Sequence, residues 1–478
     1  MPDGSPDRPN VVFVLCDQMR GGAMSCAGDP NVETPTLDRL ADRGTRFENA
    51  HATYPVCVPS RFTLWTGRYA HTRNVSAIGY RLSPAEETLA DRFGAAGYRT
   101  ALVGKWHLYD ARHGTDPVPP SHRGGFDYWR GFDLNNAPFD SVYYADDDPE
   151  PRAMDGHQTD AIFDLGREFL DDHADRDEPF FLTLSAEAPH PPFRAPAEFV
   201  EPWTDRALEM PDNVPYPEGQ PPGAMRERWG SPESATADIT GADAPYLRPA
   251  LFDDMRVWYA MIEHLDAALG SFLEDLAARG LREDTVVVFL SDHGEMMGAH
   301  GLNAKQWPYR ESTRVPFVVD VPGDEGGRAV STPTCSEDWF PTLLGLAGVD
   351  VPADRPGANL APVCRGGPPP DRDGVLLQFC RERRNSEWAP FRRQTWRAFV
   401  TESYRYAVKG GDDGAEPWQL FDLEADPGET ENLVADPDRA DAARRLHGRL
   451  RDRLVAVEDD FPLAPALGHD GCNLGPGG

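Results

Sequence analysis

Four short apolar runs along the chain are each followed by polar residues. They cover residues 11–15, 100–103, 180–184 and 286–290 and consist mostly of Val, Leu and Phe. Runs that are apolar throughout, without alternation, are typical of strands buried on both faces of a parallel sheet. We therefore predict these four segments as central strands of the fold.

The segments between these strands carry apolar residues at the three- and four-residue spacing of amphipathic helices. Most of them end just before a glycine, which commonly terminates a helix. Strands that alternate with helices predict an α/β fold with a mainly parallel, doubly wound sheet. The predicted helices cover residues 35–43, 86–96, 159–173 and 252–278.

Polar residues of chemical interest come after the predicted strands. Asp17 follows the first strand closely, Lys105 the second and Asp292 the fourth, and the third runs toward His190. In a doubly wound sheet, ligands bind beyond the carboxyl ends of the strands. We therefore expect these four residues to meet at one edge of the sheet, although they are far apart in sequence.

Two long segments, 114–151 and 202–249, are rich in Pro, Gly and Asp and lack clear periodicity. We expect them to be long ordered loops over the same edge, where substrate choice is usually made. A further strand is expected at 316–321, and a further helix at 336–347.

The last quarter of the chain has a different pattern. Residues 365–374 contain several Gly and Pro residues and are predicted as a linker. The linker divides the chain into an α/β domain over residues 1–365, expected to carry the chemistry of the four strand ends, and a C-terminal α+β subdomain over residues 374–478. The second domain is expected to be a small antiparallel sheet with a helix, built from strands at 375–379, 396–402 and 404–409, a turn-rich segment at 421–433 and a helix at 439–457.

Composition narrows the class of protein. The chain has 478 residues, 40% apolar, with a net charge of −32, and only three of its 47 basic residues are lysines. A surface this acidic repels nucleic acid and anionic membranes, so we expect neither as a partner. Either a high-GC genome or adaptation to high salt accounts for the acidic, arginine-rich composition, and the sequence does not separate the two.

The beginning of the chain and the cysteines bear on localisation. The apolar run at 11–16 is too short for the core of a signal peptide or for a membrane span, so we predict a cytoplasmic protein. Seven cysteines without a Cys-x-x-Cys pair are consistent with reduced thiols and argue against zinc.

The stretch at residues 57–67, CVPSRFTLWTG, reads as a loop that enters a helix. We expect Ser60 to be the N-cap and Gly67 to lie near the end of the helix. A thiol at Cys57 would then lie at the positive end of a helix with Arg61 nearby, and both effects favour a thiolate.

At two strand ends, two neighbouring residues have side chains that commonly bind metal ions. Asp17 stands beside Gln18, and Asp292 beside His293, which together offer carboxylate, amide and imidazole donors for a divalent cation. Cations for an anionic substrate are also present in these motifs. They are Arg61, Lys105 and Lys305.

The motifs as a set resemble the sulfatases of the alkaline-phosphatase superfamily. Residues 57–67 match the first family signature and residues 97–107, GYRTALVGKWH, match the second. Further matches follow in the order of the family, and the resemblance extends from about residue 10 to about residue 433. These further matches are SDHGE at 291–295, Lys305, TRVP at 313–316 and the segment 421–433.

The resemblance implies a mechanism. A separate maturation enzyme would convert Cys57 to formylglycine, whose hydrate attacks sulfur and later expels sulfate by collapsing to the aldehyde. A divalent metal would make one hydrate hydroxyl a nucleophile at neutral pH. Asp17, Gln18, Asp292, His293 and the matured Cys57 would hold that metal.

By the same resemblance, the cations and histidines of the motifs have separate roles. Arg61 would steady the formylglycine, while Lys105 and Lys305 would neutralise the sulfate oxygens. His107 would take a proton from the second hydroxyl, and His190 would protonate the leaving alcohol. His300 is expected either to contact the substrate or to support its loop.

The sequence departs from many sulfatases at Gln18, where a second aspartate is common. Calcium is the expected ion, but a neutral amide makes the site less negative and would move the preference toward manganese or magnesium, which are the alternatives. The Asp-Gln and Asp-His pairs also resemble phosphonate monoester hydrolases and choline sulfatases. Hydrolysis of phosphonate monoesters or phosphodiesters is therefore the alternative activity.

A third hypothesis is an inactive relative that only binds sulfated ligands. Such a protein should have lost part of the catalytic set, and every residue of that set is present, from Cys57 to Lys305. The expected substrate is a small sulfate ester of a sugar, aryl or alkyl compound, because the acidic chain shows no basic groove for a sulfated polymer. The oligomeric state is left open.

Overall fold

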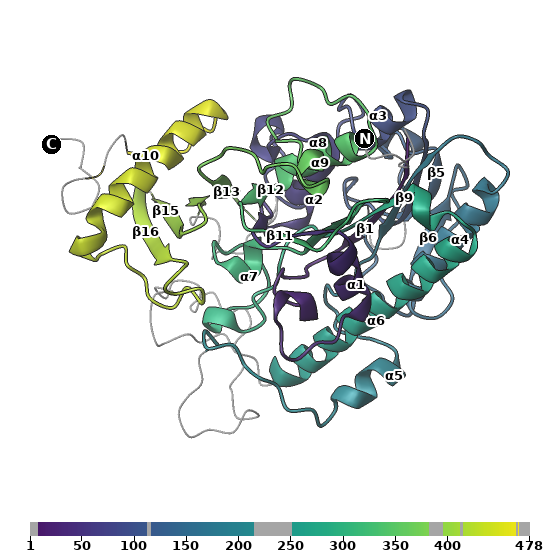
Figure 1. Ribbon diagram of the computed structural model, residues 1–478, viewed down its shortest axis with the longest axis horizontal. Coiled ribbons are helices and arrows are strands. Elements are labelled where there is room, and N and C mark those ends of the chain that lie inside the picture. The colour runs from purple at the N-terminus through teal and green to yellow at the C-terminus, as the bar shows by residue number, and fades with distance from the viewer. Residues whose placement is uncertain are drawn as a thin grey trace.

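The computed structural model describes residues 8–111, 116–214, 251–381, 395–411, 414–464 and 467. Within these residues, ten strands form one large sheet in the order β11-β2-β10-β9-β1-β8-β4-β5-β6-β7 (Figure 1). The four predicted central strands are confirmed as neighbours in this sheet. They are β1 (Asn10–Cys16), β4 (Arg99–Lys105), β8 (Phe180–Ser185) and β9 (Thr285–Ser291).

The central strands run parallel and in register. Val12 of β1 pairs with Leu182 on one side and with Val287 on the other. All residues of β8 and β9 are buried, as expected for strands covered on both faces. The predicted parallel, doubly wound α/β fold is thus confirmed.

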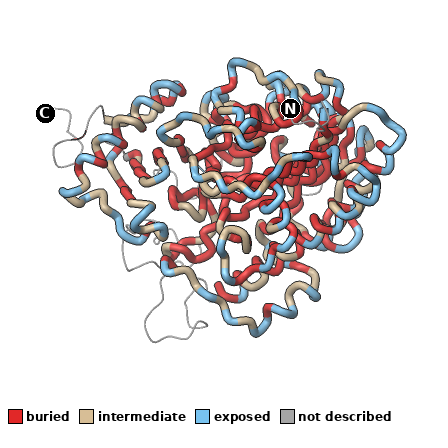
Figure 2. The backbone as a smooth tube through the Cα atoms, viewed as in Figure 1, coloured by how far each residue is buried: buried red, intermediate tan, exposed pale blue. Residues whose placement is uncertain are grey.

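Helices cover both faces of this sheet, and its alternating side chains feed two cores. Phe13 points into one core together with α2 (Cys57–Thr66), α3 (Leu89–Ala95) and α8 (Ser336–Leu346). Val12 points into the other together with α1 (Pro35–Arg43), α4 (Gln158–His173) and α6 (Leu251–Ala278). Figure 2 shows the buried residues concentrated along the sheet between these layers.

Both margins of the sheet differ from the simple parallel pattern. The strand predicted at 316–321 is present as β10 (Phe317–Asp320), but it runs antiparallel to β9. Beyond it, β2 (Thr45–Phe47) and β11 (Arg328–Val330) complete that margin.

The prediction of a continuous loop at 114–151 is wrong. Its residues form β5 (Tyr128–Phe132) and β6 (Val142–Ala145), and β7 (Arg152–Ala153) follows. Arg130 and Gly131 interrupt the apolar run of β5 and hide the strand from a pattern search. Most of the other predicted loop, 202–249, lies outside the described residues.

A four-stranded antiparallel sheet and α10 (Ala440–Ala456) form the C-terminal unit, to the left in Figure 1. Three of its strands were predicted: β13 (Val375–Phe379), β14 (Trp396–Val400) and β15 (Tyr404–Gly411). The fourth, β16 (Gly414–Asp422), was missed. It contains Pro417, a residue that argues against a strand.

The remaining elements are short. None of the helices among the described residues is both long and apolar enough to cross a membrane. The short elements are η1 (Ser25–Ala27), β3 (Ala50–His51), η2 (Ala70–Arg73), η3 (Pro120–His122), α5 (Ala197–Val200), η4 (Glu201–Trp203), η7 (Arg282–Asp284), η8 (Ala299–Gly301), α7 (Arg310–Thr313), β12 (Thr334–Cys335), α9 (Ala361–Cys364) and η9 (Pro437–Arg439).

Candidate active site

Cys57 lies at the first position of α2, whose N-cap is Val56. The prediction of Ser60 as N-cap is therefore wrong, because the helix begins a turn earlier. Ser60 instead donates a hydrogen bond of 2.5 Å from Oγ to the carbonyl of Asp292. Gly67 terminates the helix in the left-handed region, at φ 66°, as predicted. The thiol thus lies at the positive end of a helix dipole.

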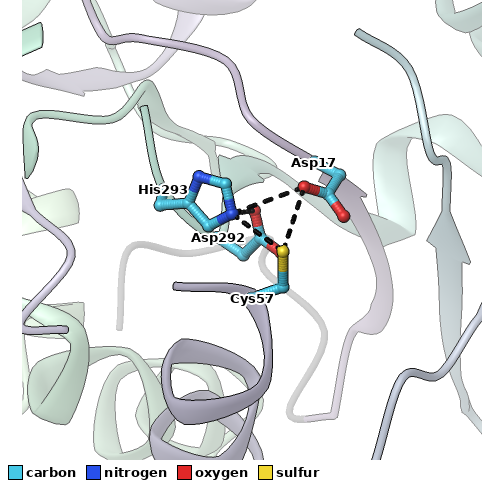
Figure 3. Close-up of side chains that lie close together, drawn as sticks. All are labelled: Asp17, Cys57, Asp292 and His293. Atoms are coloured by element: carbon cyan, nitrogen blue, oxygen red, sulfur yellow. Dashed lines mark hydrogen bonds and ion pairs between the residues drawn. The ribbon is translucent and has the colours of Figure 1, made fainter. Parts of the chain in front are cut away.

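The carboxyl ends of β1 and β9 bring two acidic residues and a histidine to Cys57 (Figure 3). These strands are neighbours in register, with Cys16 beside Ser291, so the residues that follow them are adjacent. The Cys57 Sγ lies 3.0 Å from His293 Nε2 and 3.8 Å from Asp17 Oδ1. The expectation that separate strand ends meet at one edge is met here.

The donor atoms of this group suit a divalent cation. Four residues each offer one ligand atom, and these atoms all lie within 4.8 Å of one another: Asp17, Cys57, Asp292 and His293. His293 Nδ1 lies 3.0 Å from the Gly294 carbonyl, and donation of that hydrogen bond leaves a lone pair on Nε2 facing the cluster. Two carboxylates and an imidazole that converge in this way fit a metal site, to which the imidazole would bind in its neutral form.

The outer oxygens of both aspartates are held by cations. Lys105 Nζ lies 2.5 Å from Asp17 Oδ2, and Arg61 Nε lies 2.8 Å from Asp292 Oδ2. All four side chains are buried. Each aspartate therefore keeps one oxygen, Oδ1, toward His293 at 3.5 and 3.6 Å.

Lys305 closes the group from the other side of Cys57. Its Nζ lies 3.2 Å from Cys57 Sγ and donates to Gln18 Oε1 at 2.6 Å. The Gln18 Nε2 in turn donates to Glu295. Lys305 thus stands between the predicted nucleophile and the predicted amide ligand.

Electrostatics in this buried group favour ionised forms. Burial opposes ionisation of Asp17, but Lys105 and other nearby positive charges hold the pKa of its carboxyl well below the usual range. Burial and Asp17 raise the pKa of the Cys57 thiol, yet Lys305 and His293 outweigh them and leave it below its ordinary value. These are the charges expected where an anion is to be stabilised.

The two predicted proton-transfer histidines lie beside these charges. Burial, followed by the charge of Lys105, places the pKa of His107 well below its ordinary value, so the imidazole is neutral, the form that a proton acceptor needs, while the same effects weaken it as a base. Its Nδ1 is buried without a hydrogen-bond partner among the described residues. The pKa of His190 is likewise low, through burial and then Lys305.

A neutral His190 does not match the predicted role of proton donor in the free protein. Its Nδ1 lies 2.6 Å from the Pro191 carbonyl, which leaves Nε2 for another partner. An anionic substrate between Lys305 and His190 would oppose the effect of that lysine and raise the pKa of the imidazole.

His300 is held by its own loop. Its ring stacks on Tyr309 with centroids 3.8 Å apart, and its Nε2 lies 3.6 Å from Glu311 and 3.3 Å from the amide of Asn213. Of the two roles expected for His300, these contacts favour loop support.

Sequence reasoning assigned no role to Glu295 or Ser185, which the structure places in the site. Ser185, the last residue of β8, accepts a hydrogen bond of 3.0 Å from Arg61 Nη1. Glu295 lies two residues after His293 and is 2% exposed. Its position within the SDHGE motif was the available signal, but a single glutamate in a motif does not reveal its partner.

The chain is similar to known proteins over most of its length. The sulfatase family matches residues 9–349, and the C-terminal family of N-sulphoglucosamine sulphohydrolase matches residues 298–456. An ulvan-active sulfatase of Formosa agariphila is 33% identical, over 95% of this chain and 83% of its own length.

Two solved structures have the same fold. A Bacteroides fragilis protein described as the sulfatase YidJ superposes with a TM-score of 0.80 at 25% identity, covering 97% of this chain and 98% of its own. The phosphonate monoester hydrolase of Agrobacterium radiobacter gives a TM-score of 0.72 at 25% identity, covering 95% and 96%. The family match covers more than half of the chain, and on that ground the protein is a member of the sulfatase family.

Proposed function

We propose that this sulfatase hydrolyses a sulfate ester to an alcohol and inorganic sulfate through a formylglycine made from Cys57, with a divalent metal ion beside it. The observation that carries the proposal is the convergence on Cys57 Sγ of His293, Asp17 and Lys305. The sulfur occupies the place that a hydroxyl on the same carbon would take after conversion. A hydrated aldehyde there would supply a hydroxyl nucleophile and a way to expel sulfate.

Asp17, Asp292 and His293 would hold the metal, with the matured Cys57 as a further ligand and Gln18 as an amide ligand. When bound, the ion lowers the pKa of a hydroxyl and stabilises charge on oxygen. Carboxylate and amide oxygens favour calcium, with manganese and magnesium as the alternatives.

The buried charges of the site support this composition. Three buried cations, Arg61, Lys105 and Lys305, lie in the site together with three buried carboxylates, those of Asp17, Asp292 and Glu295. A divalent ion adds two positive charges, which an ionised formylglycine hydrate and a sulfate monoester would balance. A dianionic phosphate monoester would leave the site with an excess of negative charge.

The other side chains would divide the remaining work. Arg61, which is fixed by Asp292 and Ser185, would hold the matured residue in place. Lys105 and Lys305 would neutralise the sulfate oxygens as charge develops on them. His107 would accept a proton from the formylglycine hydrate, and His190 would donate one to the departing alcohol.

Peptide mass and turnover test the proposal together. Trypsin releases residues 47–61 as one peptide, whose mass should show that the Cys57 thiol has been replaced by an aldehyde in protein co-expressed with a formylglycine-generating enzyme. The same protein should hydrolyse 4-nitrophenyl sulfate, lose that activity on chelation and regain it with calcium, manganese or magnesium. Cys57→Ala is the control and should be inactive. An intact thiol in fully active protein would contradict the proposal.

Sulfate esters are expected to be the better substrates. The relatives matched over most of the chain are sulfatases, and the similarity to the phosphonate monoester hydrolase does not favour that alternative. Hydrolysis of a phenyl phosphonate monoester by the matured protein should be the slower reaction. The name of the ulvan-active relative directs the substrate screen to sulfated sugars beside aryl and alkyl sulfates.

A further inference from the structure

A second group of cations lies beside the reaction centre, where α7 meets the C-terminal sheet. Two cavities, of about 360 and about 320 Å³, share Arg310 and Arg314 in their walls. The smaller cavity also contacts Arg46 of β2 and Arg405 of β15. Four arginines around one cavity are notable in a chain whose net charge is −32.

Two of these arginines have carboxylate partners. Arg405 is paired with Glu429 at 2.6 Å, and Arg46 with Glu48 at 2.9 Å. For Arg314, by contrast, no described carboxylate lies within ion-pair distance. Its guanidinium makes one long hydrogen bond, 3.4 Å from Nη1 to the Glu48 carbonyl.

The surroundings of Arg314 compensate its charge only in part, through Glu311 and Glu429. Burial, followed by repulsion from Arg310, lowers the pKa of Arg314 to about 9. The two nearest carboxylates are engaged elsewhere: Glu311 accepts from Asn213 at 3.0 Å, and Glu429 is held by Arg405 and by the Arg310 backbone amide at 2.9 Å. The guanidinium of Arg314 is only partly exposed and has no described ion-pair partner, a position that an accompanying anion would stabilise.

We propose that Arg314, assisted by Arg310, forms a second binding site for a sulfate group, separate from the reaction centre. Guanidinium groups bind oxyanions through paired N–H donors, and the cavity beside them has room for such a group. The choice of sulfate rests on the proposed function. The sulfate could be the free product or a second sulfate group on the substrate.

The backbone links this site to the reaction centre. The Ser312 carbonyl accepts from the Gly294 amide at 2.8 Å, directly after His293. The Arg314 carbonyl accepts from the Gly21 amide at 2.8 Å, three residues after Gln18. An anion bound at Arg314 would therefore steady both segments that carry the proposed metal ligands.

Sulfate binding without turnover tests the proposal. Full-length protein carrying Lys105→Ala and Lys305→Ala, whose reaction centre should not retain sulfate, is titrated with sodium sulfate by calorimetry. Sodium chloride keeps the ionic strength constant. One saturable site is expected, and adding Arg314→Met should weaken it at least tenfold. Arg39→Met, which removes an exposed arginine elsewhere, should leave binding unchanged.

Two further experiments keep the test possible if one of these variants does not fold. Arg310→Gln changes a partly exposed residue and should weaken binding several-fold if Arg314→Met does not fold. If the double lysine variant does not fold, the unaltered protein should bind two sulfates, and Arg314→Met only one.

Absence of sulfate binding in the folded double lysine variant would overturn the proposal, as would unchanged binding in a folded Arg314→Met protein. Neither result bears on formylglycine or turnover, so the proposed function is judged separately. Glucosamine with one or two sulfates identifies the source of the bound group. If Arg314→Met weakens binding of the disulfated sugar alone, the bound group is a second sulfate of the substrate. If it weakens binding of inorganic sulfate alone, the bound group is the product.

Discussion

The carboxylate of Glu295 fixes the orientation of the Gln18 side-chain amide. A carboxylate only accepts hydrogen bonds, so the Gln18 Nε2 must be the atom that faces it. The amide oxygen therefore faces Lys305, at 2.6 Å. Glu295 is itself held by the backbone amides of Met297 and Ala304, at 2.9 and 2.6 Å.

We predict that Glu295→Gln lowers activity and metal affinity, although residue 295 itself does not contact the substrate. A glutamine at 295 can also donate, so the Gln18 amide is free to turn and to present its NH₂ group to Lys305. Changes at residues that orient metal ligands commonly cost about 10-fold or more in activity or metal affinity. kcat/KM for 4-nitrophenyl sulfate and the metal concentration giving half-maximal activity measure the loss.

A double-mutant cycle identifies the route of this effect. In a Gln18→Met background, Glu295→Gln should cost little more, because the group that it orients is gone. Equal losses in both backgrounds would show that Glu295 acts through the 297–304 loop and not through Gln18.

Arg61→Lys is expected to fail although the charge is kept. Arg61 makes three directed contacts, to Asp292 at 2.8 Å, to Ser185 at 3.0 Å and to the Lys105 carbonyl at 3.2 Å. A lysine ammonium cannot reproduce this planar arrangement. Misplacement of the reacting group by about 1 Å can cost roughly 100-fold, and we expect kcat/KM to fall by about that factor.

The control for Arg61→Lys is Arg68→Lys, just beyond the end of the same helix, at a partly exposed ion pair. That change should leave kcat/KM unaltered. A fully active Arg61→Lys protein would show that charge alone suffices at this position.

The sequence identified the strands that position the site, and the reason is physical. Residues 11–15 and 286–290 are buried on both faces, so their apolar pattern is unbroken. The strand β5 was missed because Arg130 and Gly131 interrupt its pattern. β16, the strand that pairs with β15, was missed because Pro417 interrupts its pattern.

Within the site, motifs predicted which residues gather but not which contacts they make. Asp17, Cys57, Asp292 and His293 were expected together and lie together. The hydrogen bond from Gln18 to Glu295 spans 277 positions, and no local pattern records it. His190 is neutral in the free protein because burial and the charge of Lys305 lower its pKa. Both effects come from the fold, so the sequence did not predict them.

Gly104→Ala should separate two central strands. Gly104 has φ 104°, and a Cβ there would collide with the carbonyl oxygen of Ser185. Because that oxygen belongs to the backbone of β8, the strands must move apart. We expect a loss of about 3 kcal/mol or more in unfolding free energy, together with lost activity, because Lys105 follows directly.

Gly94→Ala is the matched control, since nothing lies within 4 Å of a Cβ at that helical position. It should be neutral or stabilise by up to about 1 kcal/mol. Urea unfolding followed by circular dichroism compares the two variants, and a Gly104→Ala protein as stable as Gly94→Ala would contradict the close approach of β4 to β8 at this glycine.

The buried carboxyl of Glu337 should make the free energy of unfolding fall as the pH rises toward neutrality. Burial raises the pKa of Glu337 to about 7, although Thr53 donates to it at 2.5 Å. A carboxyl whose pKa is raised in the folded state contributes fully to the free energy of unfolding below its unfolded pKa of about 4.3. That contribution is lost as the pH rises through 7.

Glu337→Gln removes this titration. Relative to the unaltered protein, the variant should gain roughly 2 to 3 kcal/mol between pH 4.5 and pH 8. Urea unfolding at both values measures the difference between the two proteins, so the other carboxylates cancel, and a difference independent of pH would show that Glu337 is ionised in the folded protein.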